Sequence, residues 1–81
     1  MNCQEIWENA CKLLKVEMSE VSYNTWIGDS LKPKWIQGDQ FFLEIINGIH
    51  RSMIARYATL IGNAVNAASG RRMAVQFVTA Q

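Results

Sequence analysis

The chain has 81 residues, of which 49% are hydrophobic and 19% are charged, with five glycines and one proline. This composition excludes low complexity and disorder. A chain of this length buries only roughly 60–65% of its unfolded surface, which leaves little volume for a deep catalytic cavity. Residues 1–81 are therefore predicted to form a single soluble domain.

The charge is unevenly divided along the chain. Residues 1–47 contain four lysines and all seven acidic residues, a net charge of −3, whereas residues 48–81 contain all four arginines, a net charge of +4. This asymmetry has two interpretations: a weak preference for anionic partners, or the ordinary asymmetry of a small domain.

The N-terminus lacks the apolar run of a secretory signal, and no stretch approaches the ~20 apolar residues of a membrane span. Cys3 and Cys11 are eight positions apart on one predicted helix, too far along its axis for a disulfide, and they lack the neighbours of a zinc site. We therefore expect a reduced, cytoplasmic protein that does not associate with membranes.

The first predicted element is an amphipathic helix over residues 4–18. Its apolar residues occupy one side, with acidic residues early and lysines late, as the helix dipole favours. These apolar residues are Ile6, Trp7, Ala10, Cys11, Leu13, Leu14 and Met18. Ser19 is then a suitable N-cap for a short second helix that ends at Gly28.

Strands are predicted next. Residues 31–36 read as an edge or irregular strand because they include Pro33. Gly38-Asp39 predicts a hairpin turn, after which Phe41, Leu43 and Ile45 alternate onto one face.

Asn47 is predicted to cap one long helix over residues 48–68, which ends at Ser69-Gly70. Residues 73–78 complete the sheet, with Met73, Val75 and Phe77 on its buried face. The expected fold class is α+β and KH-like, in the order helix, helix, strand, strand, helix, strand, with helices packed on a small three-stranded sheet.

The sequence contains no glycine-rich phosphate loop, no metal-ligand spacing and no nucleophile–base constellation. His50 is the single histidine, and its position favours packing or a helix-end role over catalysis. A non-enzymatic binding protein without cofactor or metal is therefore expected.

Nucleic acid is the alternative partner. KH domains clamp the nucleic-acid backbone with a G-x-x-G loop, and this chain has no such loop. Nonspecific phosphate contacts would then be made by the arginines of residues 48–81. The candidate residues are Arg51, Arg56, Arg71 and Arg72.

The segment "EIWENACKLLKVEMSEVSYNTWI", the "GD" turn and the closing "VQFV" together resemble domain I, the N-terminal domain of the bacterial replication initiator DnaA. The similarity extends from Ile6 to Val78. It implies a KH-like interaction domain without ATPase activity, either as a piece of an initiator or as a free-standing homologue. Its implied roles are self-association and docking of the replicative helicase or regulators of initiation.

Trp7 lies toward one flank of the apolar side of the first helix, where it is either a core residue or part of an exposed ridge that pairs with a second copy. The resemblance favours the second interpretation, because Trp7 matches the family's self-association tryptophan by position, so Trp7→Ala is expected to leave a folded monomer. A second set of residues matches the docking surface where the second helix meets the start of the third. That set comprises Ser22, Tyr23, Thr25, Trp26, Asn47 and Ile49. The chain departs from the family at residues 46–49, where the usual pattern is P-N-x-F and Ile49 replaces an aromatic anchor.

Two structural questions follow from these residues. Tyr23 and Trp26 are either both core residues, or one is buried and the other lies at the rim of a docking patch. The outer side of the long helix is small and neutral at Ala55, Thr59 and Gly62, which indicates either a second contact region or merely a low charge.

Overall fold

The computed structural model describes residues 2–46 and 48–79, with only the backbone described at residue 49. The elements follow the predicted order, and the α+β prediction is confirmed. They are α1 (Cys3–Glu17), α2 (Glu20–Tyr23), the π-helical η1 (Asn24–Gly28), β1 (Leu31–Gln37), β2 (Gln40–Ile45), the 3-10 helix η2 (Gly48–His50), α3 (Arg51–Arg56), α4 (Ala58–Ser69) and β3 (Ala74–Thr79).

Helix α1 begins with a capping box. The Asn2 side chain accepts a hydrogen bond from the Glu5 N–H at 2.9 Å, and the Glu5 carboxylate accepts one from the Asn2 N–H at 3.3 Å. Two of the N–H groups that every helix start leaves free are thereby satisfied. The helix begins one residue earlier than the sequence predicted.

The predicted cap of the second helix is confirmed, because the Ser19 hydroxyl accepts a hydrogen bond from the Ser22 N–H at 3.1 Å. The helix ends at Gly28 as expected. Its second half, η1, is π-helical: the Asp29 N–H donates to the Asn24 carbonyl, five residues back, at 3.1 Å.

The sheet of the described residues has the order β1-β2-β3, with β1 antiparallel and β3 parallel to β2. Gly38 turns the hairpin with φ of 59°, a left-handed conformation that glycine adopts at low cost. Strand β1 lies at an edge, and its register shifts between Pro33 and Trp35, so the prediction of an irregular edge strand is confirmed.

The prediction of one long helix is wrong, because Tyr57 separates α3 from α4. Tyr57 has φ of −98° and ψ of 5°, and its N–H donates to the Ile54 carbonyl only three residues back, at 2.9 Å. This tighter turn redirects the chain. Apolar residues on both sides of the break still face the core, Ile54 before it and Ile61 after it, so periodicity alone does not reveal it.

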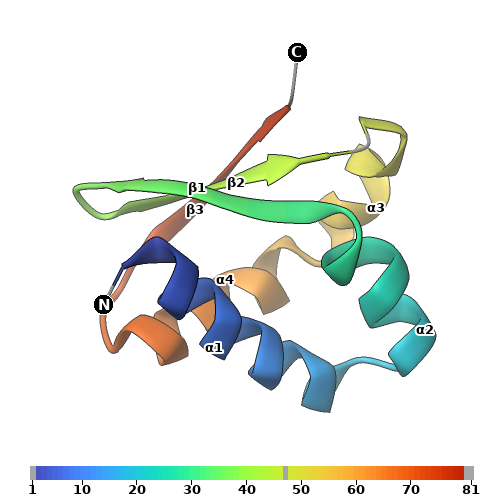
Figure 1. The fold of residues 1–81 in the computed structure, drawn as a ribbon, viewed down its shortest axis with the longest axis horizontal. Helices are drawn as coiled ribbons and strands as arrows, with labels where there is room; N and C mark the ends of the chain where they lie inside the picture. The colour runs from blue at the N-terminus through green and yellow to red at the C-terminus, as the bar shows by residue number, and fades with distance from the viewer. Residues whose placement is uncertain (1, 47, 80–81) are drawn as a thin grey trace.

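The helices cover one face of the sheet and leave the other face open (Figure 1). The domain measures 31 × 29 × 18 Å along its principal axes. Buried apolar side chains of the described residues form a hydrophobic cluster between the helices and the sheet. Its fully enclosed members include Leu14, Ile27, Phe41, Leu43, Ile54, Ile61 and Val65.

Candidate protein-docking site

Tyr23 is a core residue. It is 8% exposed, its hydroxyl pairs with the Cys11 thiol, and the Lys15 ammonium lies 5.2 Å from the centre of its ring. Burial raises the pKa of the Tyr23 hydroxyl and that of the Cys11 thiol, so both groups stay neutral at physiological pH. Tyr23 therefore joins α2 to α1.

Trp26 is half-buried at the rim of the core. Its ring meets the ring of His50 nearly at right angles, 79°, with 4.9 Å between ring centroids. Edge-to-face contacts of this kind are favourable between aromatic rings. Of the two interpretations of the aromatic pair, the structure supports the one with Tyr23 buried and Trp26 at the rim.

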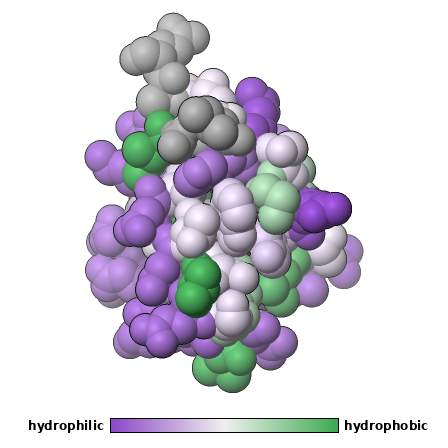
Figure 2. Space-filling model, turned by 90° about the vertical axis from the view of Figure 1, so that its right-hand side faces the viewer, coloured by the Kyte–Doolittle hydropathy of each residue, from purple (hydrophilic) through white to green (hydrophobic). Residues whose placement is uncertain are grey.

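Trp26 and His50 bring the second helix against the start of the third. Ser22 and Thr25, which precede Trp26 in the sequence, are also half-buried. We call the surface formed by Ser22, Thr25, Trp26 and His50 the α2–α3 surface. Figure 2 shows the side of the molecule that carries α2, where hydrophobic residues lie among neutral and hydrophilic ones.

Two predicted members of this surface are only partly accounted for. Asn47 lies outside the described residues, and Ile49 is described only as part of the η2 backbone. Two apolar side chains near these residues are exposed: Val21, next to Ser22 on α2, is 77% exposed, and Ile46, whose N–H donates to the Ser30 carbonyl, is 52% exposed.

Ser30, which was not among the predicted site residues, is fully buried beneath the α2–α3 surface. Its hydroxyl lies 2.6 Å from the Thr25 carbonyl oxygen and 2.9 Å from Nδ1 of His50. The position of Ser30 just beyond a helix end could have identified it, because hydroxyl side chains there often form hydrogen bonds with free backbone groups. The expectation that His50 packs at a helix end is confirmed by these contacts.

Of the two interpretations of Trp7, the structure of the single chain supports the core residue and contradicts the exposed ridge. Trp7 is 5% exposed, and its ring lies 6.4 Å from that of Phe41 between centroids. The side of α1 that carries Trp7 faces the sheet. Leu13, which the sequence placed on the buried side, is instead 42% exposed, and Val16 is 82% exposed.

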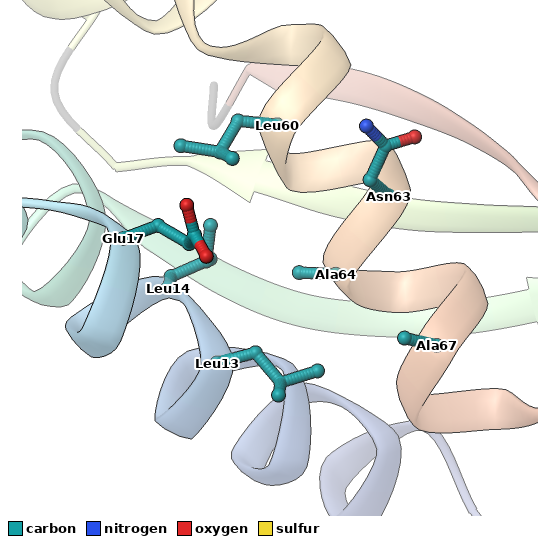
Figure 3. A pocket seen from close by; sticks show the side chains of 7 residues that line it. All are labelled: Leu13, Leu14, Glu17, Leu60, Asn63, Ala64 and Ala67. Carbon is teal, nitrogen blue, oxygen red and sulfur yellow. The ribbon is translucent and has the colours of Figure 1, made fainter.

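A groove lies between α1 and α4, beside Leu13 (Figure 3). Its volume is about 330 Å³, and side chains of the two helices face each other across it. The lining residues are Leu13, Leu14, Glu17, Leu60, Asn63, Ala64 and Ala67. Helix α4 has no charged residue, and Glu17 of α1 is the one charged side chain among these lining residues.

The arginines proposed for nucleic-acid contact fall into two separate pairs. Arg71 follows α4 and donates to the Gly38 carbonyl of the hairpin turn at 2.9 Å, with Arg72 beside it. Arg51 and Arg56 lie on α3, at the opposite end of the molecule from that turn (Figure 1). All four are exposed, but they do not form one continuous basic patch.

Within residues 2–46 and 48–79, no group of three or more His, Cys, Asp or Glu side chains could hold a metal ion. No helix of the described residues is long and apolar enough to cross a membrane. A comparison with protein families found no family model that matches the chain.

Proposed function

We propose that this chain is a non-enzymatic docking module of the bacterial cytoplasm that resembles DnaA domain I. In this proposal it acts in the initiation of chromosome replication, where it self-associates and binds the replicative helicase or regulators of initiation. The observation that carries the proposal is the half-buried Trp26, whose ring contacts the ring of His50 where η1 meets η2.

The chemistry of this surface suits a protein partner. Tryptophan is enriched among the few residues that dominate binding energy, particularly where it is partly enclosed by neighbours that exclude water. Val21, next to Ser22 on α2, and Ile46, whose N–H donates to the Ser30 carbonyl, add exposed apolar side chains, while Ser22 and Thr25 supply polar groups. An apolar centre with a polar rim is the usual anatomy of a protein interface.

Self-association has a different location in this proposal. Since Trp7 is buried, contact between copies is assigned to two exposed apolar residues of α1: Leu13, which lines the α1–α4 groove, and Val16. Their exposed fractions of 42% and 82% make them available without any change in the fold. The nucleic-acid alternative is less favoured because its four arginines are divided between two ends of the molecule.

A crossover experiment tests both parts of the proposal. Binding to the purified replicative helicase is measured by biolayer interferometry, and self-association by sedimentation equilibrium, for Trp26→Ala and Val16→Asp. We expect Trp26→Ala to weaken helicase binding by about 30-fold, since a hot-spot residue contributes roughly 2 kcal/mol or more. Val16→Asp should weaken self-association only.

Salt separates this proposal from the nucleic-acid alternative. Helicase binding through an apolar surface should change little between low and physiological salt, whereas phosphate-driven binding to an oligonucleotide weakens steeply. Helicase binding that is absent, or equal in wild type and Trp26→Ala, would refute the docking function.

A further inference from the structure

The buried Ser30 hydroxyl determines which nitrogen of His50 carries a hydrogen. A hydroxyl has one proton to donate, and a carbonyl oxygen can only accept. The 2.6 Å contact between Ser30 Oγ and the Thr25 carbonyl therefore uses the hydroxyl proton. His50 Nδ1, 2.9 Å from the same oxygen, must then be the donor in that contact.

The end of η1 explains why the hydroxyl is needed there. After Asp29 bonds five residues back, the next N–H, that of Ser30, donates instead to the Ile27 carbonyl at 3.4 Å. The Thr25 carbonyl thus receives the Ser30 side chain in place of a backbone N–H. A buried carbonyl without a partner would cost free energy, so the serine side chain completes the helix end.

These hydrogen bonds and the contact between aromatic rings connect Thr25, Ser30, His50 and Trp26 in a ring beneath the docking surface. Thr25 bonds to Ser30, Ser30 bonds to His50, and the His50 ring meets Trp26, which is the residue after Thr25. The backbone N–H of Ile46 also donates to the Ser30 carbonyl at 2.8 Å, which attaches the end of β2 to the same point. The η1 segment and the start of η2–α3 are thereby held together around one buried hydroxyl.

We propose that His50 is a positioning residue: the hydrogen bond from its Nδ1 to the Ser30 hydroxyl fixes its ring, and the ring fixes the orientation in which Trp26 meets a partner. This inference rests on the proposed docking function and adds a residue to it. A side chain ordered before binding loses less conformational entropy when the complex forms. His50 therefore increases affinity by ordering Trp26 before the partner binds.

The first measurement follows Trp26 in the free protein. The three tryptophans give three indole N–H signals in a ¹⁵N-correlated NMR spectrum, assigned with Trp→Phe variants. His50→Phe keeps an aromatic ring but removes the donor, and Ser30→Ala removes the acceptor. In both variants, relaxation should show increased motion of the Trp26 indole, while the indole of Trp35, which stacks on Phe42 instead, serves as the unaffected control.

The second measurement uses the purified replicative helicase as the probe. We expect His50→Phe and Ser30→Ala each to weaken binding by about three- to tenfold. Because the two residues act in series, the double variant should bind no more weakly than the weaker single variant. If Ser30→Ala does not fold, His50→Phe alone carries the test.

The outcomes distinguish this inference from the proposed function. An unchanged Trp26 indole in His50→Phe overturns the positioning role. So does a mobile indole with unchanged affinity, provided that Trp26→Ala weakens binding in the same assay. If Trp26→Ala binds as wild type does, the docking function fails, and the indole measurement still decides whether His50 holds Trp26.

Discussion

Replacing Trp7 with alanine is expected to destabilise the domain strongly rather than to change only its association. Trp7 is 5% exposed and packs against Phe41 in the core. Truncation of a buried tryptophan removes its favourable transfer from water and leaves a cavity, and together these cost about 3–5 kcal/mol.

That cost is large relative to the whole domain. At 0.05–0.15 kcal/mol per residue, a chain of 81 residues has a stability of roughly 4–12 kcal/mol. In a domain of this size each kcal/mol lowers the Tm by about 4–8 °C. Trp7→Ala should therefore lower the Tm by roughly 12 °C or more, and a large fraction of the variant would be unfolded at moderate urea concentrations.

Urea and thermal unfolding, followed by far-UV circular dichroism, measure this loss. Trp35→Ala is the matched control, because Trp35 is 46% exposed and stacks on Phe42 at the open face of the sheet. Its loss should cost roughly 1 kcal/mol. A Trp7→Ala variant as stable as this control, folded but unable to self-associate, would refute the packing of α1 described above and support Trp7 as the contact between copies.

Two further predictions concern glycine and pH. Gly70 ends α4 with φ of 72°, so Gly70→Ala should destabilise the domain by about 1 kcal/mol. Gly62→Ala, with no atom within 4 Å of the added Cβ, should instead stabilise the helix by roughly 0.5–1 kcal/mol. Shifts of the urea midpoint in the same direction for both variants would contradict this prediction. Burial raises the pKa of Cys11 and that of Tyr23 in the folded state. Their contribution to stability is therefore complete at neutral pH and is lost as pH rises above their ordinary values of about 8.5 and 10. The urea midpoint should fall between neutral pH and about pH 10.5, less so in Tyr23→Phe, and an equal fall in that variant would contradict the assignment.

Much of the fold was predictable because its signals are local. Ser19 caps a helix, Gly38 turns a hairpin and Gly70 ends a helix, each through the conformation or hydrogen bond of one or two residues. The alternation of Phe41, Leu43 and Ile45 similarly defines the buried face of β2 without reference to the rest of the chain.

The features that the sequence did not reveal depend on contacts between distant segments. The periodicity of α1 indicates its apolar side, but only the positions of α4 and the sheet decide that Trp7 is covered and Leu13 is left at the rim. The break at Tyr57 is hidden because the apolar residues before and after it keep the same spacing.

The candidate site also combines features that have a local signal in the sequence with features that depend on distant contacts. The resemblance to DnaA domain I pointed to Trp26 as a candidate site residue, but whether Trp26 lay in the core or at the rim could not be predicted from the sequence. Ser30 was missed because its importance comes from His50, which is 20 positions away in the sequence. A buried polar contact between such distant residues has no periodic signature.

The irregularity of β1 affects which edge strand of the sheet can pair with a strand from another molecule. Pro33 has no N–H to donate, and the shift in register after it interrupts the regular spacing of backbone groups. An extended peptide would find few matching hydrogen-bond partners along that border. Strand addition, whether by a ligand peptide or during aggregation, is therefore directed to the β3 side, where Ala74–Thr79 is regular and contains no proline.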